Sequence, residues 1–184
     1  MAIPPDPSGA RTRLIILNAI GGIAVLATYA LTFSRPDAGE ILWGGVPEAW
    51  RPLYTNNMFL AAAGYFPFTW LLVFGSDPAR VRFLGRFGYG VLAVFYALVL
   101  FPSAAWLPLT FAFADSGSML LWWAVRIDLA LVAVGALGIL GAVVTVDPPP
   151  NRALQVLAVV GGLAFCLQTV VLDAAIWPVY YPMP

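Results

Sequence analysis

Three ionisable residues lie inside long apolar stretches of this sequence. Arg126 and Asp128 lie two residues apart in LLWWAVRIDLALVAVGALGIL, which begins at Leu120, and Asp173 lies in VVLDAAIW. A charged side chain at the centre of a bilayer costs about 2.5–3.5 kcal/mol even on the gentlest scale. Such residues usually face other helices or a wet cavity, so they are the first candidates for a ligand site, a proton site or a catalytic acid–base pair.

Helical geometry separates Arg126 from Asp128. At about 100° per residue, two positions that are two residues apart point about 200° apart. Asp128 shares its face with Gly135 and Gly138, which predicts close packing of another helix. Arg126 shares its face with Trp122, one turn away, where a cation–π contact is favoured. The two residues therefore belong to different sites.

Arg126 and Asp173 are expected at the same depth in the membrane. With the nearest tryptophans as interface markers, each lies about 6 Å inward at 1.5 Å per residue, and Asp128 lies about 9 Å inward. One hypothesis is an ion pair between Arg126 and Asp173, with Asp128 near Asn57 of another helix. The alternative is that these groups only fix the packing of the helices.

The composition indicates an integral membrane protein and excludes several kinds of site. The chain has 184 residues, of which 61% are hydrophobic and 10% charged, whereas soluble domains are about 25% charged. It has no His, no Lys and one cysteine, Cys166. This excludes His-ligated haem, the usual zinc and di-iron sites, an internal disulfide and a Schiff-base lysine. We expect no cofactor and no metal, and the net charge of zero gives no reason to expect nucleic acid.

Five apolar segments are long enough to cross a bilayer, which takes about 20 residues. The sequence therefore predicts an all-α polytopic membrane protein, a bundle of five transmembrane helices in a single domain, residues 1–184. The third segment contains Pro102 and Pro108, which we expect to bend the helix. The predicted spans are residues 14–33, 57–74, 87–113, 119–146 and 153–177.

The distribution of arginine predicts the orientation, because short cytoplasmic loops carry an excess of positive charge. Arg35 and Arg51 lie on one side. The N-terminus is therefore predicted to be cytoplasmic and the C-terminus outside. The loop from Ser34 to Asn56 carries Trp43 and Trp50 and is either an interfacial loop or a lid over a pocket. The arginines on the N-terminal side are Arg11, Arg13, Arg80, Arg82, Arg86 and Arg152.

The last three predicted helices resemble the TspO/MBR family of tryptophan-rich translocator proteins. The stretch LDAAIW has the family's Leu-Asn-x-x-aliphatic-Trp spacing, with Asp173 in place of Asn, and Trp123 precedes Asp128 by one residue more than in the family. The resemblance implies a five-helix bundle that binds porphyrins, sterols or similar flat hydrophobic molecules under the first loop. Because the predicted orientation is opposite to the family's, the pocket would open to the other side. The stretch AAWLPLTFAF matches the family's third helix through Trp106, Pro108, Phe111 and Phe113.

Aromatic and polar residues thus converge at one depth in the outer half of the membrane. The first hypothesis is a protein that binds, transports or senses a flat hydrophobic small molecule such as a porphyrin, a sterol or an isoprenoid. Two other classes stay open. One is a membrane-embedded isomerase or cyclase that uses Asp128 and Asp173 as its acid–base pair on an isoprenoid or sterol. The other is an accessory subunit that packs against a second copy or a partner membrane protein. The predicted ligand-binding residues are Asn57, Trp106, Phe111, Trp122, Trp123, Arg126, Asp128, Asp173 and Trp177.

Overall fold

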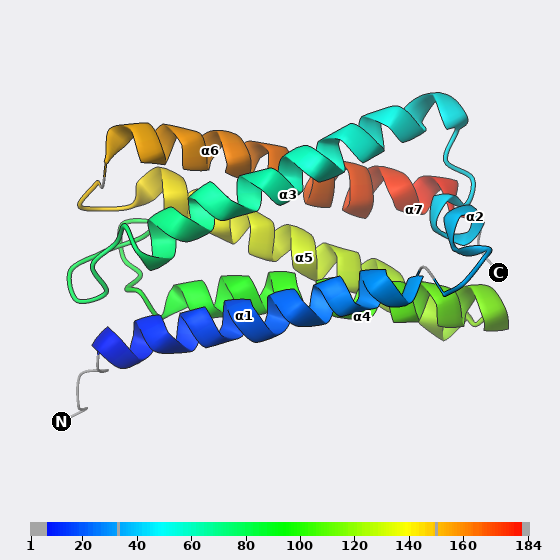
Figure 1. The fold of residues 1–184 in the computed structure, drawn as a ribbon, viewed down its shortest axis with the longest axis horizontal. Helices are drawn as coiled ribbons and strands as arrows, with labels where there is room; N and C mark the ends of the chain where they lie inside the picture. Colours follow the sequence, from blue (N-terminus) through cyan, green and yellow to red (C-terminus); the bar gives the residue numbers. More distant parts are fainter. Residues whose placement is uncertain (1–6, 33, 150, 182–184) are drawn as a thin grey trace.

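The protein is a bundle of long helices joined by turns (Figure 1). The computed structural model describes residues 7–32, 34–149 and 151–181. Within these ranges there is no β-strand, only isolated bridges between Arg82 and Asp147 and between Phe83 and Phe87, so the predicted all-α class is confirmed. The elements are α1 (Pro7–Thr32), α2 (Ala38–Trp43), η1 (Glu48–Trp50), α3 (Arg51–Val73), α4 (Val91–Ser116), α5 (Met119–Thr145), α6 (Arg152–Cys166), η2 (Leu167–Ile176) and α7 (Trp177–Tyr180).

Four of these helical segments are long and apolar enough to cross a membrane: Gly9–Thr32, Val91–Ser116, Met119–Thr145 and Arg152–Tyr180. The last combines α6, η2 and α7. Large apolar side chains such as Ile23, Leu26 and Leu120 point outward from them, as expected where lipid replaces water. The chain is therefore an integral multi-pass membrane protein. Helix α3 has 23 residues but is not among these four. The structure therefore supports four of the five predicted spans.

Several helix boundaries differ from the predicted spans, among them the starts of α3 and α4. Helix α3 begins at Arg51 rather than at Asn57, with Pro52 in its first turn, a position at which proline favours helix formation. Helix α4 begins at Val91 rather than at Phe87 because residues 82–87 form a tight turn closed by hydrogen bonds between Phe83 and Phe87. The first predicted span ends at Phe33, which lies outside the described residues.

Helices α4 and α5 pack through the small-residue face that the sequence predicts. A side chain at Gly135 would lie 2.8 Å from the carbonyl oxygen of Phe95, and one at Gly138 would strike the Phe95 ring. Helix α4 remains continuous through Pro102 and Pro108. The glycines therefore bring the two backbones together, and α4 covers this face of α5 at Gly135 and Gly138.

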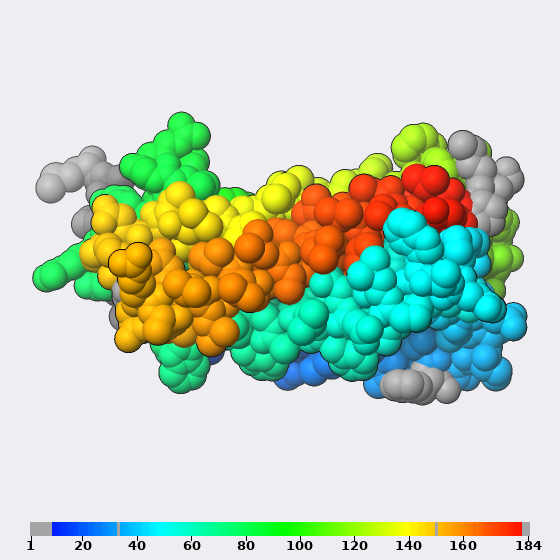
Figure 2. Space-filling model, turned by 90° about the horizontal axis from the view of Figure 1, so that it is seen from above, coloured from blue at the N-terminus to red at the C-terminus, as the bar shows by residue number. Residues whose placement is uncertain are grey.

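Helices α3 and α6 make an equally close contact. A Cβ at Gly64 would lie 2.6 Å from the Cα of Gly161, and one at Gly161 would lie 2.6 Å from the carbonyl oxygen of Gly64. Figure 2 shows α3 in cyan alongside the orange-to-red segment that begins with α6. This contact sets the position of η2 and α7, which continue α6 toward the other end of the bundle.

The loop between α1 and α3 is more structured than predicted. It is shorter than the expected 34–56, because α3 begins at Arg51, and it folds into α2 and η1. These elements lie at the end of the bundle that also holds the end of α4 and the α7 segment (Figure 1). The buried side chains at this end form a separate, strongly aromatic cluster that includes Tyr54, Phe113, Trp122 and Trp177.

Candidate functional site

The loop that contains α2 is fastened to the end of the bundle. The indole Nε1 of Trp177 donates a hydrogen bond to the carbonyl oxygen of Leu42 at 2.8 Å, and the backbone N–H of Gly45 donates to the carbonyl oxygen of Tyr180 at 3.0 Å. At Gly44 the backbone φ is 51°, and a side chain there would lie 2.6 Å from the ring of Tyr181. The loop thus lies over the end of α7. This is the position that the alternative of a lid over a pocket requires.

Arg35 ties the same loop to helix α4. Its Nε donates to Asp37 at 2.8 Å, its Nη2 donates to Asp115 at 2.6 Å, and its guanidinium lies 4.8 Å from the ring centroid of Phe111. Hydrogen bonding to Arg35 holds the pKa of the Asp37 carboxyl below its ordinary value, and the two carboxylates raise the pKa of Arg35. Phe111, a predicted ligand residue, therefore supports this cluster.

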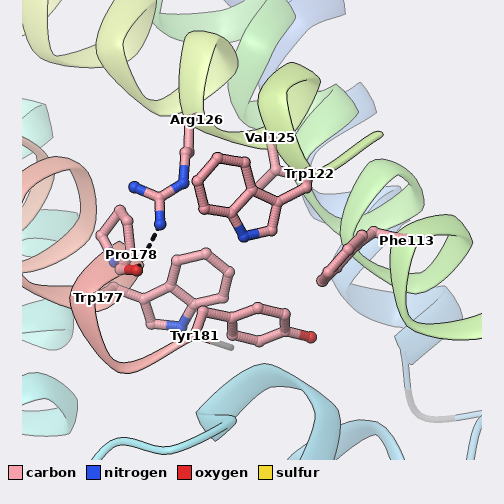
Figure 3. A pocket seen from close by; sticks show the side chains of 7 residues that line it. All are labelled: Phe113, Trp122, Val125, Arg126, Trp177, Pro178 and Tyr181. Atoms are coloured by element: carbon pink, nitrogen blue, oxygen red, sulfur yellow. Dashed lines mark hydrogen bonds between the residues drawn. The ribbon is translucent and has the colours of Figure 1, made fainter. Parts of the chain in front are cut away.

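A small cavity lies inside the aromatic cluster (Figure 3). Trp122, Val125 and Arg126 line it from α5, and Trp177 faces them from α7, stacked on Tyr181 at 4.3 Å between ring centroids. The cavity leaves about 10 Å³ for the centre of a water molecule, which is room for about one water. The full lining is Phe113, Trp122, Val125, Arg126, Trp177, Pro178 and Tyr181.

A larger hollow adjoins this cavity and opens to the surface. It has a volume of about 580 Å³, within the roughly 300–1,000 Å³ that small-molecule sites occupy. Phe113 and Tyr181 line both spaces. Burial raises the pKa of the Tyr181 phenol above its ordinary value, so this hydroxyl stays neutral. The lining of this outer hollow is Glu40, Ile41, Gly44, Gly45, Phe113, Ala114, Gly117, Tyr180 and Tyr181.

Arg126 does not pair with Asp173. The Arg126 guanidinium lies 3.7 Å from the ring centroid of Trp122, as the spacing predicts, and its Nη2 donates to the carbonyl oxygen of Pro178 at 2.6 Å. The described residues form three ion pairs, and neither Arg126 nor Asp173 takes part in any of them. The prediction rested on an expected equal depth, and depth alone does not fix the direction in which a side chain points.

Asp173 instead ends a hydrogen-bonded chain that begins on α3. The Nδ2 of Asn57 donates to the Gln168 amide oxygen at 3.1 Å, and the Nε2 of Gln168 donates to Asp173 at 2.8 Å. Gln168 and Asp173 are five residues apart and both lie in η2, a π-helix. Because a π-helix has an i→i+5 hydrogen-bond register, it brings these two side chains to the same side. Asn57 thus contacts η2 rather than Asp128.

Asp128 and Trp106 each carry a buried polar atom without a hydrogen-bond partner in the described part of the chain. Oδ2 of Asp128 and Nε1 of Trp106 are both buried and unpaired there. Gly135 lies opposite Leu98 and Val99, so the antiparallel register puts Asp128 opposite residues 105–106. The Trp106 ring lies 6.0 Å from that of Trp177 between centroids. Asp128 lines neither hollow and shares no hydrogen-bond partner with Asp173.

Of the nine residues expected to bind a ligand, Trp122, Arg126 and Trp177 line the inner cavity. Trp123 is 54% exposed and points away from it. The predicted ligand residues did not include Phe113, which the resemblance had singled out, or Tyr181, and these two residues line both spaces. Tyr181 follows the end of α7 with extended backbone angles, so helical spacing from Trp177 could not have indicated it. The predicted span ended too early to include it.

Comparisons of the chain with models of known protein families, with curated proteins and with solved structures find no match. The resemblance of the last three helices to the TspO/MBR family therefore stays a prediction.

Proposed function

We propose that this membrane protein binds a hydrophobic small molecule, such as a porphyrin, a sterol or an isoprenoid, in the outer hollow beneath the α2 loop. The single observation that carries the proposal is that hollow. Its volume of about 580 Å³ suits a ligand of this size. Apolar and aromatic side chains, with backbone at Gly44 and Gly45, form most of the lining.

The loop supports the proposal because it combines buried apolar anchors with directional polar contacts. Val46 is buried in the aromatic cluster and Trp43 packs against it. Single hydrogen bonds from Trp177 and Gly45 and the exposed ion pairs of Arg35 supply the polar contacts. Exposed ion pairs typically contribute only about 0–1 kcal/mol. A loop held in this way can open to admit a ligand and then close over it, as lids do in many binding proteins.

The proposal includes α3 as a fifth span and a cytoplasmic N-terminus. Helix α3 has 23 residues, and a helix of that length extends about 34 Å, against about 30 Å of hydrocarbon. It packs against α6 along its length through Gly64 and Gly161. With α3 across the membrane, the arginine-rich loop at 80–86 lies on the same side as Arg11 and Arg13, as the positive-inside rule requires. The outer hollow then opens away from the cytoplasm.

The test is ligand binding with one wall of the hollow filled. Purified protein in lipid nanodiscs is titrated with protoporphyrin, cholesterol and retinol, and bound ligand is counted by native mass spectrometry. Ala114 lines the outer hollow, whereas the exposed Ala112 on the same helix does not. We expect Ala114→Trp to weaken binding of the accepted ligand at least tenfold and Ala112→Trp to leave it unchanged. Equal binding by both variants, or binding of none of the three ligands to the native chain, would refute the proposal.

A further inference from the structure

Arg126 is a cation without an acidic partner at the inner edge of the aromatic cluster. Its contacts in the described part of the chain are the face of Trp122 and one hydrogen bond to the carbonyl oxygen of Pro178. Neither partner carries a formal charge. An arginine within an apolar helix costs several kcal/mol unless an anion or water compensates it. The guanidinium has five N–H donors, so donors remain for a further acceptor.

Trp122 supplies a second unused donor in the same place. The residue is only 5% exposed, and its indole Nε1 is buried without an acceptor among the described residues. Figure 3 shows this nitrogen on the edge of the ring that faces the space between Trp122, Trp177 and Tyr181. Buried polar groups are nearly always hydrogen-bonded, and an exception calls for a missing water, ion or ligand.

The size of the cavity limits what can meet these two donors. It leaves about 10 Å³ for the centre of a water-sized group, enough for about one such group. A single water would satisfy the indole N–H and could accept from Arg126, but it would bring no negative charge to the guanidinium. A carboxylate oxygen is of similar size, and charge-assisted hydrogen bonds to arginine are about twice as strong as neutral ones.

The position of the cavity shows where the rest of the molecule would lie. Phe113 and Tyr181 form walls of both the inner cavity and the outer hollow. Their ring centroids lie 5.6 Å apart, so a molecule that parts these two rings can place its head group at Arg126 and its apolar body in the outer hollow. In this arrangement the head group of the ligand lies in the inner cavity and its apolar body lies in the outer hollow.

We infer that the ligand is an amphipathic carboxylate, whose head group binds the Arg126 guanidinium and the Trp122 indole N–H while its apolar body fills the outer hollow. This inference rests on the proposed function for the location of the apolar body. The same carboxylate chemistry is offered by a free acid and by the head group of a serine phospholipid, and the test separates the two sources.

The test compares retinoic acid with retinol, which share an isoprenoid body and differ only in the head group. In phosphatidylcholine nanodiscs we expect the native protein to bind the acid at least tenfold more tightly than the alcohol. Arg126→Gln should abolish this preference while retinol still binds. Arg126→Lys should keep part of it, since the positive charge remains. Trp122→Phe should reduce it severalfold, because one of two donors is lost.

The source of the carboxylate is tested with a second set of nanodiscs that contain phosphatidylserine. Competition with retinoic acid in these discs assigns the site to the lipid head group, and no competition assigns it to a free acid. Equal affinity for the acid and the alcohol, or an acid preference that survives in Arg126→Gln, would overturn the inference. Retinol binding that Ala114→Trp abolishes would still uphold the proposed function, so the two failures are distinguishable.

Discussion

Gln168 connects two helices because its amide can donate and accept at once. It accepts from Asn57 and donates to Asp173, and it is only 9% exposed. We expect Gln168→Leu to lower the free energy of unfolding by about 1–2 kcal/mol. The substitution takes one acceptor from the Asn57 amide, which keeps its bond to the carbonyl oxygen of Ala164, and it leaves Asp173 without its donor. Reversible unfolding in mixed detergent micelles measures the difference.

The matched control is Val171→Ala, which alters an outward-facing side chain of the same π-helix that is 41% exposed. This control should change the free energy of unfolding by less than about 0.5 kcal/mol, as surface substitutions usually do. If Gln168→Leu unfolded as easily as the control, the chain from Asn57 to Asp173 would have no role in stability.

Asp37 makes the attachment of the α2 loop sensitive to acid. Hydrogen bonding to Arg35 holds its pKa below the ordinary value of 3.8. A carboxyl with a depressed pKa in the folded state contributes stability above its ordinary pKa, and this contribution is lost as the pH falls through the folded value. We therefore expect amide protection of Ala38–Trp43, corrected for intrinsic exchange, to fall severalfold between pH 6 and pH 3.

In Asp37→Asn the protection of this helix should already be lower at pH 6 and should then fall less toward pH 3. The remaining pair between Arg35 and Asp115 keeps the loop from detaching completely. A variant that matched the native protein at both pH values would show that the ion pair between Arg35 and Asp37 does not hold the loop.

Residue types predicted some partners well and others poorly. The stacking of Arg126 on Trp122 followed from their spacing of four, because that spacing fixes which side chains share a face. The partner of Asp173 could not be found in this way. Its bond to Gln168 requires a π-helix, and an α-helical register places residues five apart on different sides. Partners between helices depend on rotation about each helix axis, which one sequence does not determine.

At the scale of elements, the glycine contact between α3 and α6 decides how closely these helices approach. A Cβ at Gly161 would lie 2.6 Å from the carbonyl oxygen of Gly64, and backbone on both sides leaves no flexible group to yield. We expect Gly161→Ala to destabilise the protein by about 1–3 kcal/mol, the usual range for an overpacked core. Thermal unfolding in detergent provides the measurement.

Gly22 provides the comparison, since nothing lies within 4 Å of the Cβ that alanine would add there. Alanine is a better helix former than glycine by about 0.5–1 kcal/mol, so Gly22→Ala should be neutral or stabilising. Equal effects of the two substitutions would mean that α3 and α6 are free to move apart.

The elements themselves were largely readable from the sequence. Long apolar runs indicated each long helix, and Gly135 and Gly138 indicated the face on which α4 packs. The structure of the loop was not readable. Helix α2 has six residues, which is too short to produce a clear periodic pattern. Two hydrogen bonds to the distant α7 segment hold this loop: Trp177 donates to the carbonyl oxygen of Leu42, and Gly45 donates to the carbonyl oxygen of Tyr180.

At the scale of the whole molecule, the arrangement across the membrane follows from whether α3 is a span. If it is, the loop at 34–50 and the loop at 74–90 lie on opposite sides, and the second lies in the cytoplasm because it carries Arg80, Arg82 and Arg86. If α3 lies along the surface instead, both loops lie on one side. With α3 as a span and the arginine-rich loop in the cytoplasm, the site beneath α2 opens away from the cytoplasm.

Cysteine labelling of whole cells separates these arrangements. Cys166 is the only cysteine in the sequence and is buried, so Cys166→Ala provides a background without thiols. Glu48 and Ala79 are exposed positions in the two loops. We expect Glu48→Cys to react with an impermeant maleimide in intact cells and Ala79→Cys to react only after permeabilisation. Reaction of both in intact cells, or of neither, would rule out α3 as a span. The reverse pattern would keep the five spans and place the outer hollow on the cytoplasmic side.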